Sequence, residues 1–363
     1  IQVTRGDSVS ITANNNIVKG CTVKNIGGTA VVANGCNNLI TECEVYHTGR
    51  GGIYLYGGDR ERLIPGNNKA DNNYIHDWSE IYLTYQPGVR LNGVGNICSH
   101  NEMCRSPHEA ITYSGNNHII EYNEIYEVVL RSEDAGAIYA GRSWTDYGTV
   151  IRYNCIYNLG SGGYSPNGIY LDDGLSGQSV YGNLLINVPG YGLMLGGGRD
   201  LSVKNNIVIG SQKGIYYDAR VIEGVLDENF WFKHGRKGQV LWTGLYNSPW
   251  QTDIWKEAFP QMSKISDDFD DAENPYFGPN PAFSVVSDNI VISKSPVPSI
   301  GTISPFVTKY SAVEHNSVIN FGAIHSVFPG IAKGDYTMNA NSAFLYQLSD
   351  DFEILPLSEI GRY

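Results

Sequence analysis

The sequence predicts an all-β protein, a right-handed parallel β-helix closed by a C-terminal cap that contains a short helical, Trp-rich segment. Three observations predict this fold: a motif recurs about every 22 residues, each repeat holds at least two short strand-like segments, and the repeats lack helical periodicity. A single repeat cannot bury its apolar face alone, so the coils must stack to form a core. The 42 glycines, 25 tyrosines and only 17 % charged residues also suit a turn-rich β protein.

The first strand of each repeat carries an apolar residue in one register column. The spacing between its members varies, which implies coils of constant cross-section that carry loops of different length. The longest extra segments lie between residues 57 and 87 and between residues 125 and 167, and loops on one face of a solenoid usually mark its binding face. The column consists of Val31, Ile53, Val89, Ile111, Ile138, Ile169, Leu193 and Ile215.

A second strand follows, and a small or polar residue stands two positions before its aliphatic residue. An Asn that recurs at one register predicts a side-chain ladder inside a turn, where it satisfies backbone groups that no strand pairs and tolerates unusual φ angles. This column consists of Cys21, Cys43, Asn73, Asn101, Asn123, Asn154, Asn183 and Asn206.

The repeat is predicted to fail after about residue 220. We expect coils in residues 1–220, a Trp-rich and partly helical insertion in 221–275, and C-terminal strands with a capping tail in 276–363. The stretch "SPWQTDIWKEAFPQM" reads as a short helix with Pro249 near its start. The tryptophans either shield the last coil or stack on sugars, and both roles are compatible. They are Trp231, Trp242, Trp250 and Trp255.

Composition limits the partners that we expect. A net charge of −12 argues against nucleic acid, and no apolar run is long enough to span a membrane. Few charges and many tyrosines favour a neutral carbohydrate as partner, bound by a monomer. Most of the six cysteines are expected to be small core residues with free thiols, and no cofactor is predicted. The chain opens directly on strand-like residues without a signal peptide, and we expect a secreted, periplasmic or cell-surface protein.

One face of the first strands is expected to form a groove. If Ile169 and Leu171 fill the interior, then Tyr170 and Asp172 point to solvent, because alternate residues of a strand face opposite ways. Stacked strands lie about 4.8 Å apart, so outward tyrosines on successive coils would form an aromatic strip, although ordinary cross-strand stacking explains such a column as well. The outward residues include Tyr54, Tyr56, Arg90, Asn92, Tyr139, Tyr216 and Asp218, with small residues at Gly141 and Gly196 beside Asp172.

The stretch "GIYLDDG" places Asp172 and Asp173 side by side at the end of an apolar strand. They either cap the strand as turn residues or form a carboxylate site. Arg142 aligns with Asp173 on the neighbouring coil, and "RSEDAGAIY" places Asp134 just before that coil's strand. One coil earlier, "SPHEAI" places His108 and Glu109 before a strand. A cluster of such side chains on three consecutive coils favours a functional site.

Several segments resemble glycoside hydrolase family 141: "GNNHIIEYNEIYEV", "SEDAGAIYAGRSWTDYGTVIRYN", "GIYLDDG" and the ending "GDYTMN…EIGRY". The resemblance runs over nearly the whole chain. It implies hydrolysis of plant cell-wall glycans, with fucosidase and xylanase activities, by an aspartate acid and base. These roles fall on Asp134 and on one of Asp172 or Asp173. The resemblance also leads us to expect that the sequence begins inside the helix, without the N-terminal coils of the family.

Glycoside hydrolysis needs two carboxyl groups, about 5–5.5 Å apart for retention and about 6.5–9.5 Å apart for inversion. Asp134 aligns seven positions before Asp172, about 23 Å away if that stretch were extended. It can partner the pair only if the "RSEDAG" loop folds back over the strand. Asp172 and Asp218, two coils apart at about 10 Å, are a rival pair. We favour Asp134 because of the resemblance. Residues expected to bind substrate are Tyr56, Arg90, His108, Glu109, Tyr139, Arg142, Tyr170 and Asp218.

Two other functions remain open. A polysaccharide lyase or uronate epimerase needs a base and a cation or Arg near the substrate carboxylate. "SPHE" is similar to the "DPHE" signature of β-helix epimerases, but Ser106 replaces its Asp. Asp172 and Asp173 would then be a weak Ca²⁺ site. The third function is a non-catalytic carbohydrate-binding β-helix, in which the aspartates only finish strands.

Overall fold

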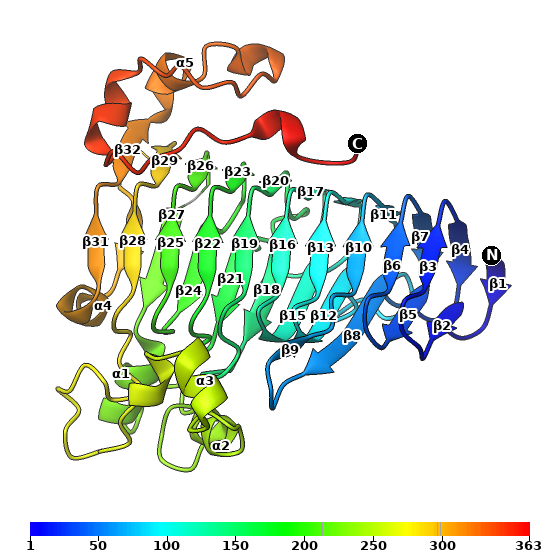
Figure 1. The fold of residues 1–363 in the computed structure, drawn as a ribbon. Coiled ribbons are helices and arrows are strands. Elements are labelled where there is room, and N and C mark those ends of the chain that lie inside the picture. The colour runs from blue at the N-terminus through cyan, green and yellow to red at the C-terminus, as the bar shows by residue number, and fades with distance from the viewer. Residues whose placement is uncertain (212, 296, 298) are drawn as a thin grey trace.

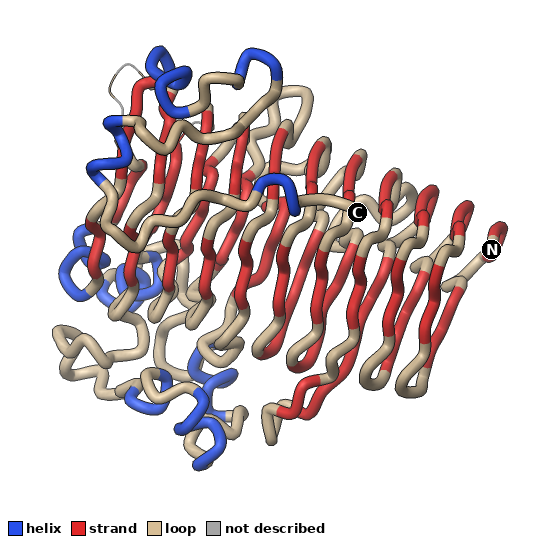
Figure 2. Tube along the Cα trace, turned by 45° about the horizontal axis from the view of Figure 1, so that its top comes forward, coloured by secondary structure: helices blue, strands red, loops and turns tan. Residues whose placement is uncertain are grey.

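The computed structural model describes residues 1–211, 213–295, 297 and 299–363. The chain winds into a parallel β-helix, and successive coils add one strand to each of three sheets (Figures 1 and 2). Every pairing along the coils is parallel, and β9 (Ile64–Pro65) forms a small antiparallel hairpin with β8. The predicted all-β parallel β-helix is therefore confirmed. No helix of the described residues is long and apolar enough to cross a membrane.

The strand bounds follow the coils. Sheet A contains β1 (Gln2–Thr4), β4 (Thr22–Ile26), β7 (Glu44–Thr48), β11 (Tyr74–His76), β14 (Glu102–Cys104), β17 (Glu124–Tyr126), β20 (Cys155–Tyr157), β23 (Leu184–Ile186), β26 (Ile207–Ile209), β29 (Ile290–Ser293) and β32 (Ser317–Asn320). Sheet B contains β2 (Val9–Ile11), β5 (Val31–Asn34), β8 (Ile53–Asp59), β12 (Val89–Val94), β15 (Ile111–Asn116), β18 (Gly136–Gly141), β21 (Asn167–Asp172), β24 (Tyr191–Gly196), β27 (Lys213–Asp218) and β30 (Gly301–Ile303). Sheet C contains β3 (Ile17–Lys19), β6 (Leu39–Thr41), β10 (Lys69–Asp71), β13 (Ile97–Ser99), β16 (Ile119–Glu121), β19 (Val150–Arg152), β22 (Ser179–Tyr181), β25 (Ser202–Lys204), β28 (Val285–Ser287) and β31 (Ala312–Glu314).

The apolar column predicted for the first strands lies in sheet B. Its members pair in register from coil to coil, as Ile138 does with Ile169, and each is fully buried. Inward residues of sheets A and C complete one continuous core along the axis. Because a coil alone buries little, this stacking supplies the hydrophobic stabilisation. All six cysteines carry free thiols, as expected.

The predicted Asn ladder is present in the turn from sheet C to sheet A. Each side-chain oxygen accepts from the backbone and side-chain amides of the Asn one coil earlier, as Asn154 does from Asn123 at 3.1 and 2.9 Å. The residue before each Asn has a left-handed backbone, for example Tyr153 with φ 53°. A second ladder, not predicted, runs through Asn16, Asn38, Asn68 and Asn96.

The prediction that the repeat fails after residue 220 is wrong. The strands β28 to β32 return to the same three sheets and continue the stack (Figure 1). Residues between β27 and β28 form a lateral insertion beside the coils, and its helices are α1 (Arg220–Leu226), α2 (Val240–Tyr246), α3 (Asp253–Ala258) and the 3₁₀ turn η1 (Met262–Lys264). Sequence reasoning missed the resumption because an insertion of this length separates two adjacent coils.

The insertion has its own aromatic core against the β-helix. Trp242 meets Trp144 edge-on at 4.8 Å between ring centroids, and both are buried, as is Trp255. Trp231 is 67 % exposed. The buried tryptophans thus hold the insertion in place and present no face to a sugar, whereas Trp231 does.

The C-terminal segment covers the outer face of sheet A. After α4 (Pro305–Tyr310) and β32, α5 (Ile324–Val327) and short 3₁₀ turns pack Phe328 and Met338 onto the outward isoleucines of sheet A. The chain then runs back along the coils, and the Tyr363 carbonyl accepts from Asn72 (Figure 1). The 3₁₀ turns are η2 (Phe321–Ala323), η3 (Ile331–Lys333), η4 (Ala343–Gln347) and η5 (Leu357–Glu359).

Candidate active site

The outer face of sheet B carries the residues that sequence reasoning singled out, but its centre is covered. Ile169 and Leu171 lie in the core, and Tyr170 and Asp172 make polar contacts outside it. The prediction that Tyr170 and Asp172 point to solvent is wrong, because they are only 3 % and 4 % exposed. The insertion that begins at Arg220 covers this part of the face.

A left-handed residue explains how two consecutive aspartates act on one partner. Asp172 ends β21 and Asp173 follows with φ 47°, whereas in a regular strand their side chains would point to opposite faces. Both carboxylates instead accept from the same nitrogen of Arg220, Nη1, at 2.8 and 3.0 Å. The pair thus turns the chain, as one reading of "DD" predicted, and its carboxylates form a buried cluster with Arg220.

Arg220 is the residue at the centre of this cluster, and sequence reasoning missed it. Its guanidinium binds Asp172, Asp173 and Asp218, the last from Nε at 2.8 Å, and its side chain is only 7 % exposed. Its outer side faces the ring of Trp231 at 5.3 Å. The one available signal was its position directly after the strand that carries Asp218.

The small residue at Gly196 does not open a groove. A Cβ atom there would lie 3.1 Å from Cζ of Arg220 and 2.8 Å from the Asp173 nitrogen. The missing side chain leaves room for the guanidinium, which occupies the predicted gap. The observation that favoured a groove thus belongs to a buried ion cluster.

The paired carboxyl groups have opposite pKa shifts. Burial raises the pKa of Asp172, the negative charge of Asp173 raises it further, and Arg220 only partly opposes them, so that the pKa reaches about 6. Burial also acts to raise the pKa of Asp173, but hydrogen bonds from Asp172 and Arg142 outweigh it and the pKa is lowered. Asp172 therefore holds a proton near pH 6 while Asp173 stays ionised.

Two tyrosines connect this cluster with Asp134. The Tyr139 hydroxyl donates to Oδ2 of Asp172 at 2.9 Å, and the Tyr170 hydroxyl donates to Oδ1 of Asp134 at 3.2 Å. Tyr170 also contacts Asp172 and lowers the pKa of that carboxyl. The Tyr170 hydroxyl thus links the "RSEDAG" loop to the strand that ends in Asp172. Among the described residues, no hydrogen bond joins one hydroxyl to both carboxyl groups.

Arg142 and Asp218 flank the cluster. Arg142 binds Oδ2 of Asp173 through Nε at 2.7 Å, as their alignment suggested, and its side chain is 56 % exposed. Asp218 meets Asp172 only through Arg220, which both of them bind. Because that guanidinium stands between them, the rival pair of Asp172 and Asp218 has no space for a sugar.

The expected aromatic strip is broken. Tyr54 and Tyr170 are buried, and Tyr139 meets Tyr170 edge-on at 5.4 Å. Arg90 stacks on the ring of Tyr54 at 4.5 Å and so covers it. Tyr56, Tyr139 and Tyr216 remain partly exposed, with gaps between them. The face offers separate aromatic contacts and no continuous platform.

His108 and Glu109 lie at the other end of the sheet B strands, just before β15. Both are buried, at 2 % and 0 % exposure, and among the described residues no hydrogen bond connects them to the aspartate cluster. In the part of the chain that the structure describes, no group of three or more His, Cys, Asp or Glu side chains is placed to hold a metal ion.

The fold and this site define a solenoid protein with an acidic cluster on one outer face. A family model described as "right handed beta helix region" matches residues 7–208, more than half of the chain. The chain belongs to this right-handed β-helix family, which is compatible with action on carbohydrates. No curated protein matches the chain. No solved structure matches it either.

Proposed function

We propose that this β-helix is a glycoside hydrolase that acts on a plant or host polysaccharide or oligosaccharide, with Asp172 as general acid and Asp134 as general base or nucleophile. The observation that carries the proposal is that these two carboxyl groups lie in different environments. Asp172 is buried and keeps its proton up to about pH 6, whereas Asp134 is exposed and accepts from the hydroxyl of Tyr170, two residues before Asp172. Glycosidases separate acid and base in this way.

Asp173, Arg220 and Arg142 support the acid. The ionised Asp173 keeps the pKa of Asp172 high, and Arg220 holds both groups in place. These three are positioning residues, because the carboxyl group of Asp172 is the one that carries the transferable proton. Their mutual contacts account for the burial of three ionisable groups, Asp172, Asp173 and Arg220, which would otherwise be costly.

The Tyr139 hydroxyl offers a path from the buried acid to the glycosidic oxygen. In the ionised state it donates to Asp172, and it is partly exposed. When Asp172 is protonated, the carboxyl donates to the Tyr139 oxygen, so the tyrosine proton is free to move to the leaving group. The C–O bond breaks as Tyr139 gives up one proton and receives another from Asp172, which balances the step.

Asp134 completes the reaction on the exposed side. Its carboxylate lies on the "RSEDAG" loop and is held by the Tyr170 hydroxyl. From there it either activates water or attacks the anomeric carbon. The resemblance to glycoside hydrolase family 141 agrees with these two roles, although no curated relative supports it, and it suggests a plant cell-wall glycan as substrate.

The test is a screen of wild-type protein against plant and host glycans, with new reducing ends as readout. We expect Asp172→Asn and Asp134→Asn to lower the release about 10²-fold or more, the usual contribution of a general acid or base. Asp350→Asn, an exposed change on the C-terminal tail, is the control and should leave the rate unchanged. Equal rates for wild type and both site variants would show that the assignment is wrong.

One observation favours a second function, a lyase or epimerase of uronate-containing glycans. The half-exposed guanidinium of Arg142 is free on one side to bind a uronate carboxylate. In that case the products absorb in the ultraviolet because they are unsaturated, or their sugar configuration changes without cleavage. Reducing ends without absorbance support hydrolysis. Binding without any turnover, unchanged in the aspartate variants, would indicate a non-catalytic carbohydrate-binding protein.

A further inference from the structure

Glu109 is a buried carboxyl group that the fold leaves unsatisfied. It is 0 % exposed, and neither of its oxygens has a hydrogen-bond partner among the described residues. Nδ1 of His108 lies 3.1 Å from Oε2 without the alignment of a hydrogen bond, and the Tyr85 amide points at the same nitrogen from 3.4 Å. One ring nitrogen cannot accept from Tyr85 and donate to Glu109 at once. A carboxyl group left in this state is costly and calls for a ligand.

Segment 80–86, part of the long turn between β11 and β12, packs on the His108 side of this pair through Tyr85. Tyr85 lies over the His108 ring, with 5.0 Å between centroids and a 57° tilt. Its carbonyl accepts from Arg90 at 2.6 Å. Among the described residues, the long 3.4 Å contact of its amide is the one hydrogen bond between this segment and the pair.

Segment 80–86 exposes apolar side chains that a soluble protein normally buries. Ile81, Tyr82, Leu83 and Tyr85 are between 41 % and 65 % exposed, and they follow one another within five residues. A contiguous apolar patch of this kind marks a contact surface. Exposed tyrosines beside a carboxyl group are the groups that stack on a sugar ring and accept from its hydroxyls.

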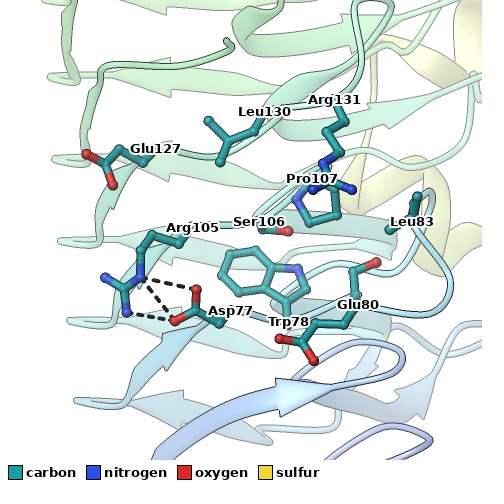
Figure 3. A pocket seen from close by; sticks show the side chains of 11 residues that line it. Asp77, Trp78, Glu80, Leu83, Arg105, Ser106, Pro107, Glu127, Leu130 and Arg131 are labelled. Atoms are coloured by element: carbon teal, nitrogen blue, oxygen red, sulfur yellow. Dashed lines mark hydrogen bonds and ion pairs between the residues drawn. The ribbon is translucent and has the colours of Figure 1, made fainter. Parts of the chain in front are cut away.

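A cavity of about 510 Å³ is lined in part by Glu80 and Leu83 of the same segment. Trp78, Glu80 and Leu83 form one wall, and Ser106 and Pro107, which lead directly into His108, form part of its floor (Figure 3). Arg131 extends beside Pro107 (Figure 3). The volume is in the range of small-ligand sites. Segment 80–86 therefore has free space to move into when it leaves the pair.

We propose that Glu109 binds a sugar residue of the glycan through hydroxyl hydrogen bonds, and that segment 80–86 is a movable cover that closes over this subsite. Strand register places Glu109 level with Gly136, two residues after Asp134 on the adjacent coil. The backbone of Glu109 thus lies one coil spacing, about 4.8 Å, from that of Gly136, where the loop that carries Asp134 joins β18. A glycan that occupies the active site reaches the subsite with a neighbouring sugar.

That the ligand is a sugar rests on the proposed function. That segment 80–86 opens and that Glu109 binds a ligand do not rest on it. The competing explanation is structural, with His108 and Glu109 as a buried ion pair. In that case removal of Glu109 leaves an uncompensated partner and destabilises the fold. If instead the carboxyl group waits for a ligand, an apolar side chain of similar shape stabilises the fold and abolishes binding.

The experiment measures binding of xylo-oligosaccharides and fucosylated oligosaccharides by calorimetry, together with the melting temperature. Glu109→Met should melt at the same or a higher temperature and bind at least tenfold more weakly than wild type. The matched control is Glu102→Met, because Glu102 accepts from the Tyr126 hydroxyl at 2.7 Å and lies outside the subsite. It should melt lower and bind like wild type. If Glu109→Met does not fold, Glu109→Gln replaces it.

Amide exchange supplies a second readout. Bound oligosaccharide should slow exchange in residues 80–86 of wild type and have no such effect in the Glu109 variant. Unchanged affinity with a lower melting temperature for Glu109→Met, or a wild type that binds none of these glycans, overturns the inference. Wild-type binding that depends on Glu109 without any turnover sustains the inference and removes the proposed hydrolase function instead.

Discussion

Replacing Asp172 with Asn separates catalysis from stability. In the unfolded chain this carboxyl group ionises near its ordinary pKa of 3.8, and in the folded protein near 6. A shift of this size corresponds to about 3 kcal/mol. Because the folded pKa is raised, the folded state is favoured below about pH 4 and loses stability as pH rises through 6.

Asn mimics the protonated carboxyl group at every pH. Its side-chain oxygen still accepts from Arg220, so the geometry is kept. We therefore expect Asp172→Asn to unfold in urea like wild type near pH 4 and to be more stable by up to about 3 kcal/mol above pH 6. Turnover should fall about 10²-fold or more at the same time.

Asp288 provides a control of opposite sign. Burial acts to raise its pKa, but the hydrogen bond from the Ser349 amide at 2.7 Å outweighs it, so the pKa is lowered. Asp288→Asn should therefore lose stability at neutral pH. If Asp172→Asn is also less stable than wild type at pH 7, or hydrolyses glycans at the wild-type rate, then Asp172 is not a catalytic acid with a raised pKa.

Three further predictions concern the cluster and the coil. Arg220→Met should lower the free energy of unfolding by about 3–5 kcal/mol because it leaves buried carboxylates unpaired. Arg142→Met, at an exposed position, should lower it by less than about 1 kcal/mol. Similar losses for the two variants in urea unfolding would contradict the buried network. Asn154→Ala should cost about 1–3 kcal/mol in the same assay because the amides that it binds lose their acceptor, and an unchanged value would show that the ladder adds no stability. The wild-type rate should fall as pH rises through about 6, whereas Tyr139→Phe should be about 10²-fold or more slower at every pH because the proton path is lost; a wild-type rate that is flat across pH 6 contradicts a titrating Asp172.

The periodic features of the fold were predictable from sequence because they depend on local geometry. An apolar residue at each Ile169-type position and an Asn at each Asn154-type position recur with the coil, so each repeat confirms the register of the next. The alignment of Arg142 with Asp173 follows from the same register. These contacts lie between neighbouring coils, where sequence spacing sets distance.

The insertion that begins at Arg220 and covers the site was not predictable in the same way. Arg220 reaches Asp172 from a segment that leaves the repeat, and no periodicity fixes where an insertion folds back. For the same reason Tyr170 was expected in solvent although it is buried. The contact between Tyr170 and the loop of Asp134 is also non-local, so the alignment alone did not predict it.

The most direct test of the central claim, that Asp172 is the acid and Asp134 its partner, compares leaving groups. Once the screen has identified the sugar, each variant is assayed on two glycosides of that sugar. One is the natural glycoside, and the other is the dinitrophenyl glycoside, whose leaving group departs without a proton. Asp172→Asn should lose about 10²-fold or more on the first and less than about tenfold on the second, while Asp134→Asn should lose activity on both. Equal losses of Asp172→Asn on the two substrates would contradict the assignment.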